Sequence, residues 1–252
     1  MTAQASPSRI HRLLSVPAVI VLGLGLPILG AILAATLSHY LPAFPSNKGP
    51  LLPWLYSQHF FQTALALIAI ALIRLVFPFD AGLRRPPGKS YILPAILWGV
   101  FFGVLMTVVD YAPQLLAHKP PPIDGADLSS ASIGGWLFFE GVYVGPTEEI
   151  LFRSLLVGYL IAALPGKLRL GRCEMSWAGV IVAAIFALAH AANFFTRPSF
   201  AAAGQQIYAF ALGVLYAYWF EKSRSIVAPI VGHNVSDVTE YAICFVLIAL
   251  WR

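Results

Sequence analysis

Acidic and histidine side chains recur inside the hydrophobic stretches of this 252-residue chain. Glu148 and Glu149 adjoin in one stretch, His190 ends a second, and His233 and Asp237 lie four residues apart in a third. Carboxylates and imidazoles exchange protons near neutral pH, and both bind zinc. Charged groups are unfavourable inside a membrane, so their concentration in three segments indicates a shared hydrolytic site.

The spacing within the first segment separates two roles. Glu149 and Arg153 are four residues apart, which places them on one face of a helix and favours an ion pair. Glu148 then remains free to act as a general base. The alternative is structural: both glutamates pair with Arg153 and a histidine and hold helices together.

The other two segments show the same helical spacing. Phe186 lies one turn before His190, so it can pack on the imidazole or line a substrate groove. His233 and Asp237 share a face, so the carboxylate can orient the imidazole, or both can act as ligands or hydrogen-bonding groups. Either histidine could instead be a polar contact between helices.

Two hydrolytic mechanisms fit these residues. In the first, a divalent metal such as zinc is bound by Glu148, His190 and His233, with or without Asp237, and keeps one position open for water. In the second, no metal takes part: Glu148 and His190 activate water while His233 and Asp237 stabilise the oxyanion. The common H-E-x-x-H zinc motif is absent from the sequence.

The composition defines the elements that must position these groups. Hydrophobic residues make up 59% of the chain and charged residues 11%, with a mean hydropathy of +0.77. This indicates a single integral membrane domain over residues 1–252 with an all-α, polytopic transmembrane bundle. We expect seven or eight spans, from apolar runs at 15–38, 58–78, 91–109, 134–164, 176–194, 201–220 and 226–250. The fourth run is long enough to be tilted or broken near Pro146.

Loop charges predict the orientation. Basic residues gather at alternate flanks: Arg9 and Arg12; Arg84, Arg85 and Lys89; Lys167, Arg169 and Arg172; Lys222 and Arg224. The positive-inside rule then predicts a cytoplasmic N-terminus, in the inner or plasma membrane if the host is bacterial. The expected partner is the lipid bilayer and not nucleic acid, since the basic residues lie in short loops. Cys173 and Cys244 fit no disulfide or metal pattern.

Two further features concern helix packing and depth. Glycines four residues apart, at 99 and 103 and at 141 and 145, predict close helix contacts within the chain. Among formally charged residues the run 58–78 holds only Arg74, near its end. At 1.5 Å per residue, straight spans would place Glu148 about 24 Å from the basic face but His233 only about 10 Å from it. Some tilt or break must therefore bring them level.

Three motifs together resemble the CAAX prenyl endopeptidase family, which includes the bacterial CAAX-protease and bacteriocin-processing membrane proteins. Glu148 to Arg153 fits E-E-x-x-x-R, Phe186 to His190 fits F-x-x-x-H, and His233 to Asp237 fits H-x-x-x-N/D. The resemblance covers the predicted catalytic region, 134–245.

The resemblance implies a role for each matched position. Glu148 would be the water-activating base assisted by His190, and His233 and Asp237 would lie on the oxyanion side. Glu149, Arg153 and Phe186 would support the site. Asp237 departs from the asparagine frequent in prenyl endopeptidases, and an ionised aspartate cannot donate to an oxyanion, so Asp237 must be protonated, orient His233 or bind a metal.

The expected function is therefore an intramembrane endopeptidase that hydrolyses a peptide bond near the membrane surface, in a membrane-associated or membrane-anchored peptide or protein. One alternative is a non-catalytic immunity or scaffold protein that retains the polar site. A proton-coupled transporter is the other, disfavoured because the sequence shows no inverted repeat.

Overall fold

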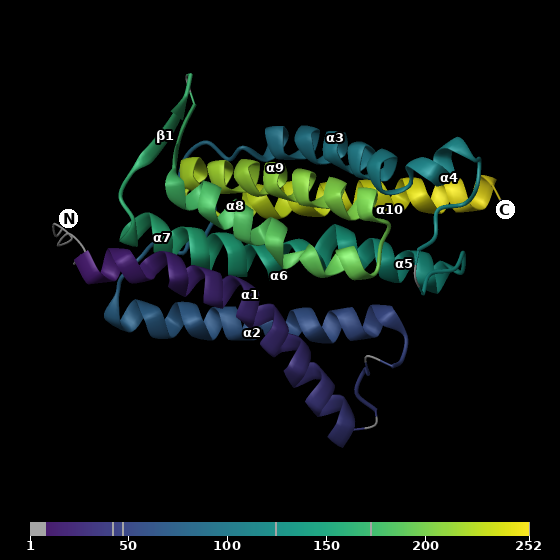
Figure 1. Cartoon of the computed structure of the whole chain (residues 1–252), viewed down its shortest axis with the longest axis horizontal. Helices are drawn as coiled ribbons and strands as arrows, with labels where there is room; N and C mark the ends of the chain where they lie inside the picture. The colour runs from purple at the N-terminus through teal and green to yellow at the C-terminus, as the bar shows by residue number, and fades with distance from the viewer. Residues whose placement is uncertain (1–8, 42, 47, 124, 172, 252) are drawn as a thin grey trace.

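The computed structural model describes residues 9–41, 43–46, 48–123, 125–171 and 173–251. Long helices dominate the fold, so the predicted all-α membrane bundle is confirmed (Figure 1). These helices are α1 (Arg9–Tyr40), α2 (Leu51–Val76), α3 (Ile92–Asp110), α8 (Trp177–Ala189), α9 (Ser199–Ser223) and α10 (Val227–Leu250). A short helix, α4 (Ala112–Leu116), follows α3, and a 3₁₀ turn, η3 (Ala191–Phe195), follows α8.

In the described part of the chain, six helices are long and apolar enough to cross a membrane, so the expected count of seven or eight is wrong. The difference arises in the predicted fourth span, which is divided into short helical segments. In order these are α5 (Ser130–Phe138), η1 (Phe139–Tyr143), α6 (Val144–Glu149), η2 (Ile150–Val157) and α7 (Gly158–Ala163).

The two η segments of this divided helix are π-helical, and the residues that join the segments keep right-handed helical angles. Pro146 has no N–H to continue the helical ladder, and η1 ends three residues before it. π-turns are rare and occur frequently at functional sites. Here they flank the segment that carries both glutamates.

A small β-hairpin lies outside the bundle. β1 (Lys167–Leu170) and β2 (Cys173–Ser176) pair antiparallel and project from one end of the molecule (Figure 1). Glu174 accepts from Lys167 Nζ at 2.5 Å and from Arg169 Nε at 2.7 Å. The hairpin occupies a flank that the sequence predicts as a basic loop.

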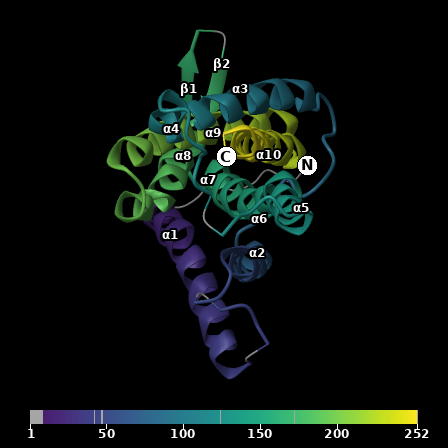
Figure 2. The same cartoon turned by 90° about the vertical axis from the view of Figure 1, so that its right-hand side faces the viewer.

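Helix α10 lies at the centre of the bundle, between α3 and the α5–α7 helix (Figure 2). Both predicted glycine pairs contact it. A Cβ on Gly103 would lie 2.5 Å from the Ser236 carbonyl oxygen, and one on Gly145 would lie 2.1 Å from Asn234 Oδ1. Because these positions carry no side chain, two helices approach α10 from different sides and fix its rotation.

The outer surface suits a lipid environment. Large apolar side chains are exposed along α1, α2 and α3, among them Leu13, Val21, Leu72, Leu75, Leu93 and Leu97. A soluble protein rarely exposes contiguous apolar patches of this kind. The protein is therefore a polytopic integral membrane protein.

The depth conflict expected for straight helices is resolved by a turn at residues 80–82. Ile226 N, just before α10, donates to Gly82 O at 3.0 Å, and a Cβ on Gly158 would lie 2.6 Å from Asp80 O. Helix α10 thus begins level with Gly158 and not with the end of α7. From that level His233 is about 10 Å along its helix and Glu149 about 13 Å along its own.

Candidate active site

Glu149 is at the centre of a fully buried polar group. One of its carboxylate oxygens lies 3.1 Å from Arg153 Nε, and the other lies 2.8 Å from His233 Nδ1. The guanidinium also faces the rings of Phe186 and Tyr216, at 4.7 and 5.1 Å from their centroids. The predicted Glu149–Arg153 pair is therefore present, and it also fixes the orientation of a histidine on another helix.

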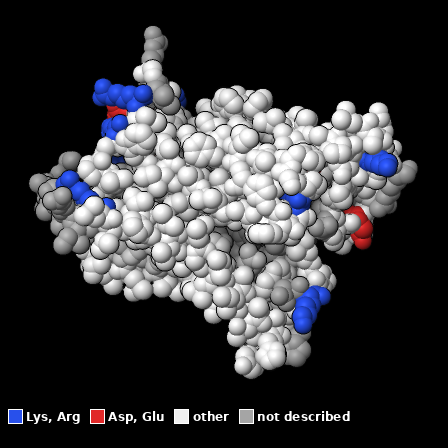
Figure 3. All heavy atoms as spheres, in the orientation of Figure 1, with Lys and Arg blue, Asp and Glu red and all other residues white. Residues whose placement is uncertain are grey.

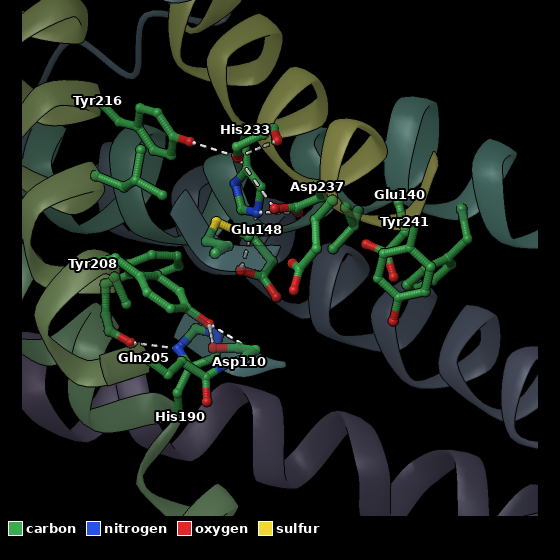
Figure 4. A pocket seen from close by; sticks show the side chains of 18 of the residues that line it. Asp110, Glu140, Glu148, His190, Gln205, Tyr208, Tyr216, His233, Asp237 and Tyr241 are labelled. Atoms are coloured by element: carbon green, nitrogen blue, oxygen red, sulfur yellow. Dashed lines mark hydrogen bonds and ion pairs between the residues drawn. The ribbon is translucent and has the colours of Figure 1, made fainter. Parts of the chain in front are cut away.

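Glu148 lies on the adjacent face of the divided helix and points into a cavity (Figure 4). Its Oε1 is 3.4 Å from His59 Nε2 and its Oε2 is 3.8 Å from His233 Nε2. The carboxylate is thus held between imidazoles from α2 and α10. Its side chain keeps 15% exposure, whereas Glu149 keeps none, so Glu148 alone of the two can meet a ligand.

His190 and Phe186 lie on the opposite wall. His190 caps α8, its Nδ1 is 2.9 Å from Phe186 O, and its ring is 5.1 Å from the Phe186 ring. Phe186 also meets the edge of the His233 ring at 6.0 Å. The expected packing of Phe186 on the imidazole is confirmed, and His190 lines the same cavity as Glu148.

All three histidines of this cavity share one arrangement. Nδ1 lies 2.9 Å from Leu55 O in His59, 2.9 Å from Phe186 O in His190 and 2.8 Å from Glu149 Oε1 in His233. An oxygen acceptor at Nδ1 places a hydrogen there and leaves Nε2 for chemistry. Three rings whose tautomer is set in this way are ready to accept or donate a proton at Nε2.

Asp237 contacts the Nε2 side of the His233 ring. Its Oδ2 lies 3.2 Å from His233 Nε2, and its Oδ1 accepts from Ser236 Oγ at 3.2 Å. The expected contact between Asp237 and His233 is therefore present, but the acceptor at Nδ1 is Glu149. Tyr216 stacks on the imidazole at 5.6 Å with a 21° interplanar angle and holds the ring in place.

The cavity around these groups has a volume of about 280 Å³. It extends beyond the predicted site residues to Glu140, Glu240 and Tyr241. Asp110 and Arg197 also line it and form an ion pair, with 2.6 Å between Asp110 Oδ2 and Arg197 Nη1. A second cavity of about 520 Å³ adjoins it near Tyr111, Asn193 and Pro198 and shares Asp110, Arg197 and Tyr241 with it.

No group of three or more His, Cys, Asp or Glu side chains in the described ranges is arranged to hold a metal ion. The donor types suit zinc, since Glu148, His190 and His233 supply a carboxylate and two imidazoles. Their observed arrangement does not form a ligand set, so zinc binding by these residues stays a prediction.

Sequence reasoning missed His59. Its ring is buried, packs edge-on against Phe139 at 5.3 Å and faces Glu148 from α2. A single imidazole at the start of an apolar run carries no spacing signal, since Glu148, the side chain that it faces, is 89 residues away in sequence. Glu140 and Glu240 also lie within apolar runs of the sequence, but their place in the cavity follows only from the packing.

Apolar helices surrounding an enclosed set of carboxylates and imidazoles define a membrane protein with the side chains of a hydrolase. The family model for type II CAAX prenyl endopeptidase Rce1-like proteins matches residues 131–239. The family resemblance seen in the three motifs is thereby confirmed over a segment that runs from α5 into α10. No curated protein and no solved structure matches the chain.

Proposed function

We propose that the protein is an intramembrane endopeptidase that hydrolyses a peptide bond with a water activated by Glu148. The main support for this proposal is the position of the Glu148 carboxylate. It faces a cavity and lies between the Nε2 atoms of His59 and His233. Glu148 also belongs to the segment that matches the family model. The substrate would be a membrane-associated or membrane-anchored peptide or protein.

The geometry supports a general-base mechanism. Glu148 takes a proton from water while the water oxygen attacks the peptide carbonyl carbon, assisted by His190 across the cavity. The carbonyl oxygen gains the negative charge, and a hydrogen on His233 Nε2, which Asp237 orients, can donate to it. When the C–N bond breaks, Glu148 returns its proton to the leaving amine.

His59 would hold a proton beside this base. Because its Nδ1 hydrogen faces Leu55 O, the contact between Nε2 and Glu148 is a hydrogen bond only if a further hydrogen lies on one of the two atoms. A hydrogen on His59 Nε2 would complete this hydrogen bond across 3.4 Å and orient the carboxylate of Glu148. His59 acts as a positioning residue for Glu148.

A metal would supply a Lewis acid and a hydroxide at this place. We expect the metal-free mechanism, because Glu148, His190 and His233 do not form a ligand group. The measurement is elemental analysis of the purified protein together with cleavage in a strong chelator. One tightly bound zinc per chain and a chelator-sensitive activity would instead favour the metal mechanism.

The orientation bears on where the substrate is cut. Lys and Arg side chains gather at the end where α1 starts and the hairpin projects (Figure 3). The cavity lies toward the other end, beside Asp110 at the end of α3 and Arg197 before α9. The loop charges predict a cytoplasmic N-terminus, which places the basic end of the molecule in the cytoplasm. Cleavage would then occur in the outer half of the membrane.

Cysteine labelling tests this orientation. The exposed Cys173 of the hairpin should react with a membrane-impermeant maleimide only after the cells are permeabilised. Thr196 lines the second cavity. In a Cys173→Ser background, a Thr196→Cys variant should react with the same maleimide in intact cells. The reverse labelling pattern would show that the cavity opens to the cytoplasm.

The decisive test of the protease is Glu148→Ala in cells and with purified protein. We expect cleavage of membrane-anchored peptides or proteins to be lost, since no other carboxylate occupies the same place between His59 and His233. Glu174→Ala, on the exposed hairpin, is the matched control and should cleave normally. If folded Glu148→Ala still cleaves at the wild-type rate, the assignment of Glu148 as the base is wrong. If the wild-type protein cleaves no such substrate and folded Glu148→Ala keeps the cellular phenotype, the protein is a scaffold or immunity factor.

A further inference from the structure

Two carboxylates line the cavity and, among the described residues, take part in no ion pair. Glu140 and Glu240 are 7% and 6% exposed, and both face the cavity that contains Glu148. Tyr241 also lines this cavity and lies beside Glu140 (Figure 4). Among the described residues, Glu240 makes no hydrogen bond and no ion pair, although it is nine-tenths buried.

The cations of the cavity are already engaged. Arg197 is bound to Asp110 at 2.6 Å, and Tyr208 also donates to that carboxylate at 3.0 Å. The imidazole of His233 is held by Glu149 on one side and by Asp237 on the other. Asp237 lies one turn before Glu240 on the same helix, so this end of the cavity has an excess of negative charge.

An ionised carboxylate buried without a partner is strongly unfavourable. It is neutralised either by a proton or by a cation that a ligand brings. The surroundings favour an organic cation: Tyr241 lines the cavity beside Glu140, and aromatic faces attract ammonium and guanidinium groups. The cavity also has room for such a group, at about 280 Å³.

We propose that Glu140 and Glu240 form a subsite that binds a basic side chain, lysine or arginine, of the peptide substrate. This deepens and rests on the proposed endopeptidase function. The helices give its position along the substrate. Glu240 follows His233 by two helical turns, about 10 Å, and an extended peptide advances about 3.3 Å per residue. The basic residue would then lie about three residues from the scissile bond.

Binding measurements test the subsite without relying on cleavage. The Glu148→Gln variant, reconstituted in nanodiscs, is titrated with membrane-anchored peptides that carry lysine at successive positions. Matched peptides carry norleucine or glutamine there. At one position, we expect the lysine peptide to bind at least tenfold more tightly than the norleucine peptide. When Glu240→Gln is added, the affinities of the two peptides should differ by no more than twofold. Glu174→Gln, added to the same background as control, should leave the preference intact.

Equal binding of lysine and norleucine at all positions, or a preference that Glu240→Gln does not change, would overturn the subsite. If Glu240→Gln loses its melting transition, Glu140→Gln makes the same comparison. The protease is judged separately, from cleavage of the same peptides by the wild-type protein. A lysine preference in binding without cleavage refutes the protease alone, and cleavage without the preference refutes the subsite alone.

Discussion

The buried ion pair between Glu149 and Arg153 offers the sharpest test of how this site is supported. Replacing Arg153 with methionine keeps most of the side-chain volume but leaves Glu149 with His233 as its remaining partner. Both members of the pair are almost completely buried, with side-chain exposures of 0% and 1%. Removing one partner of such a pair costs about 3–5 kcal/mol.

This loss converts into a large change in melting temperature. For a chain of this size, 1 kcal/mol corresponds to about 2–4 °C, so Arg153→Met should melt about 6–20 °C lower than the wild type. The assay is thermal unfolding in a mild detergent, followed by the fluorescence of the six tryptophans. Arg169→Met is the matched control, because Arg169 also bonds a glutamate, at 2.7 Å, but on the exposed hairpin. Exposed pairs contribute about 0–1 kcal/mol.

A double-mutant cycle completes the test. Glu149→Gln leaves the guanidinium unpaired, yet its amide oxygen can still accept from His233 Nδ1. The double variant Glu149→Gln/Arg153→Met buries no unpaired charge in this pair, so its destabilisation should be clearly smaller than the sum of the two single ones. Additive effects, or a loss in Arg153→Met no larger than in Arg169→Met, would refute the assignment of this pair as the charged support of the site.

Three further changes probe neighbouring parts of the site. His59→Gln should lower kcat roughly 10- to 100-fold and shift the pH profile, with KM changed less, because Glu148 loses a proton-holding partner; an unchanged profile would remove His59 from the mechanism. Gly103→Ala should destabilise the fold by about 1–3 kcal/mol in thermal unfolding, since the new Cβ meets a backbone carbonyl of α10, whereas Gly25→Ala has open space and should not. Asp237→Asn should keep most of the cleavage rate and Asp237→Ala should lose it, if the residue acts by hydrogen bonding to the histidine; equal loss in both variants would require its negative charge.

Much of the fold could be predicted because membrane helices are encoded locally. About 20 apolar residues in sequence must form a helix to satisfy their backbone in lipid. The spans ending near Val76 and Asp110 were therefore expected to within a few residues. A break of the fourth run near Pro146 was one of the two expected alternatives, but its π-helical segments were not predicted, because hydropathy does not report the backbone hydrogen-bond pattern. Pro146 marks the place, but η1 packs on α10 and η2 packs on α2, and these contacts between distant segments are not readable from hydropathy.

The candidate site shows the same division. The amino-acid sequence is enough to say which chemical groups lie in the apolar runs and which of them share a helix face: Glu149 with Arg153, and His233 with Asp237. Those relations depend on helical periodicity, which is a local property. The packing of the helices is needed to know that His233 turns its Nδ1 to Glu149, that His59 faces Glu148, and that Glu240 is buried in the wall of the same cavity. Such contacts depend on the relative depth and rotation of separate helices, which the turn at residues 80–82 and the glycine contacts with α10 set through long-range packing.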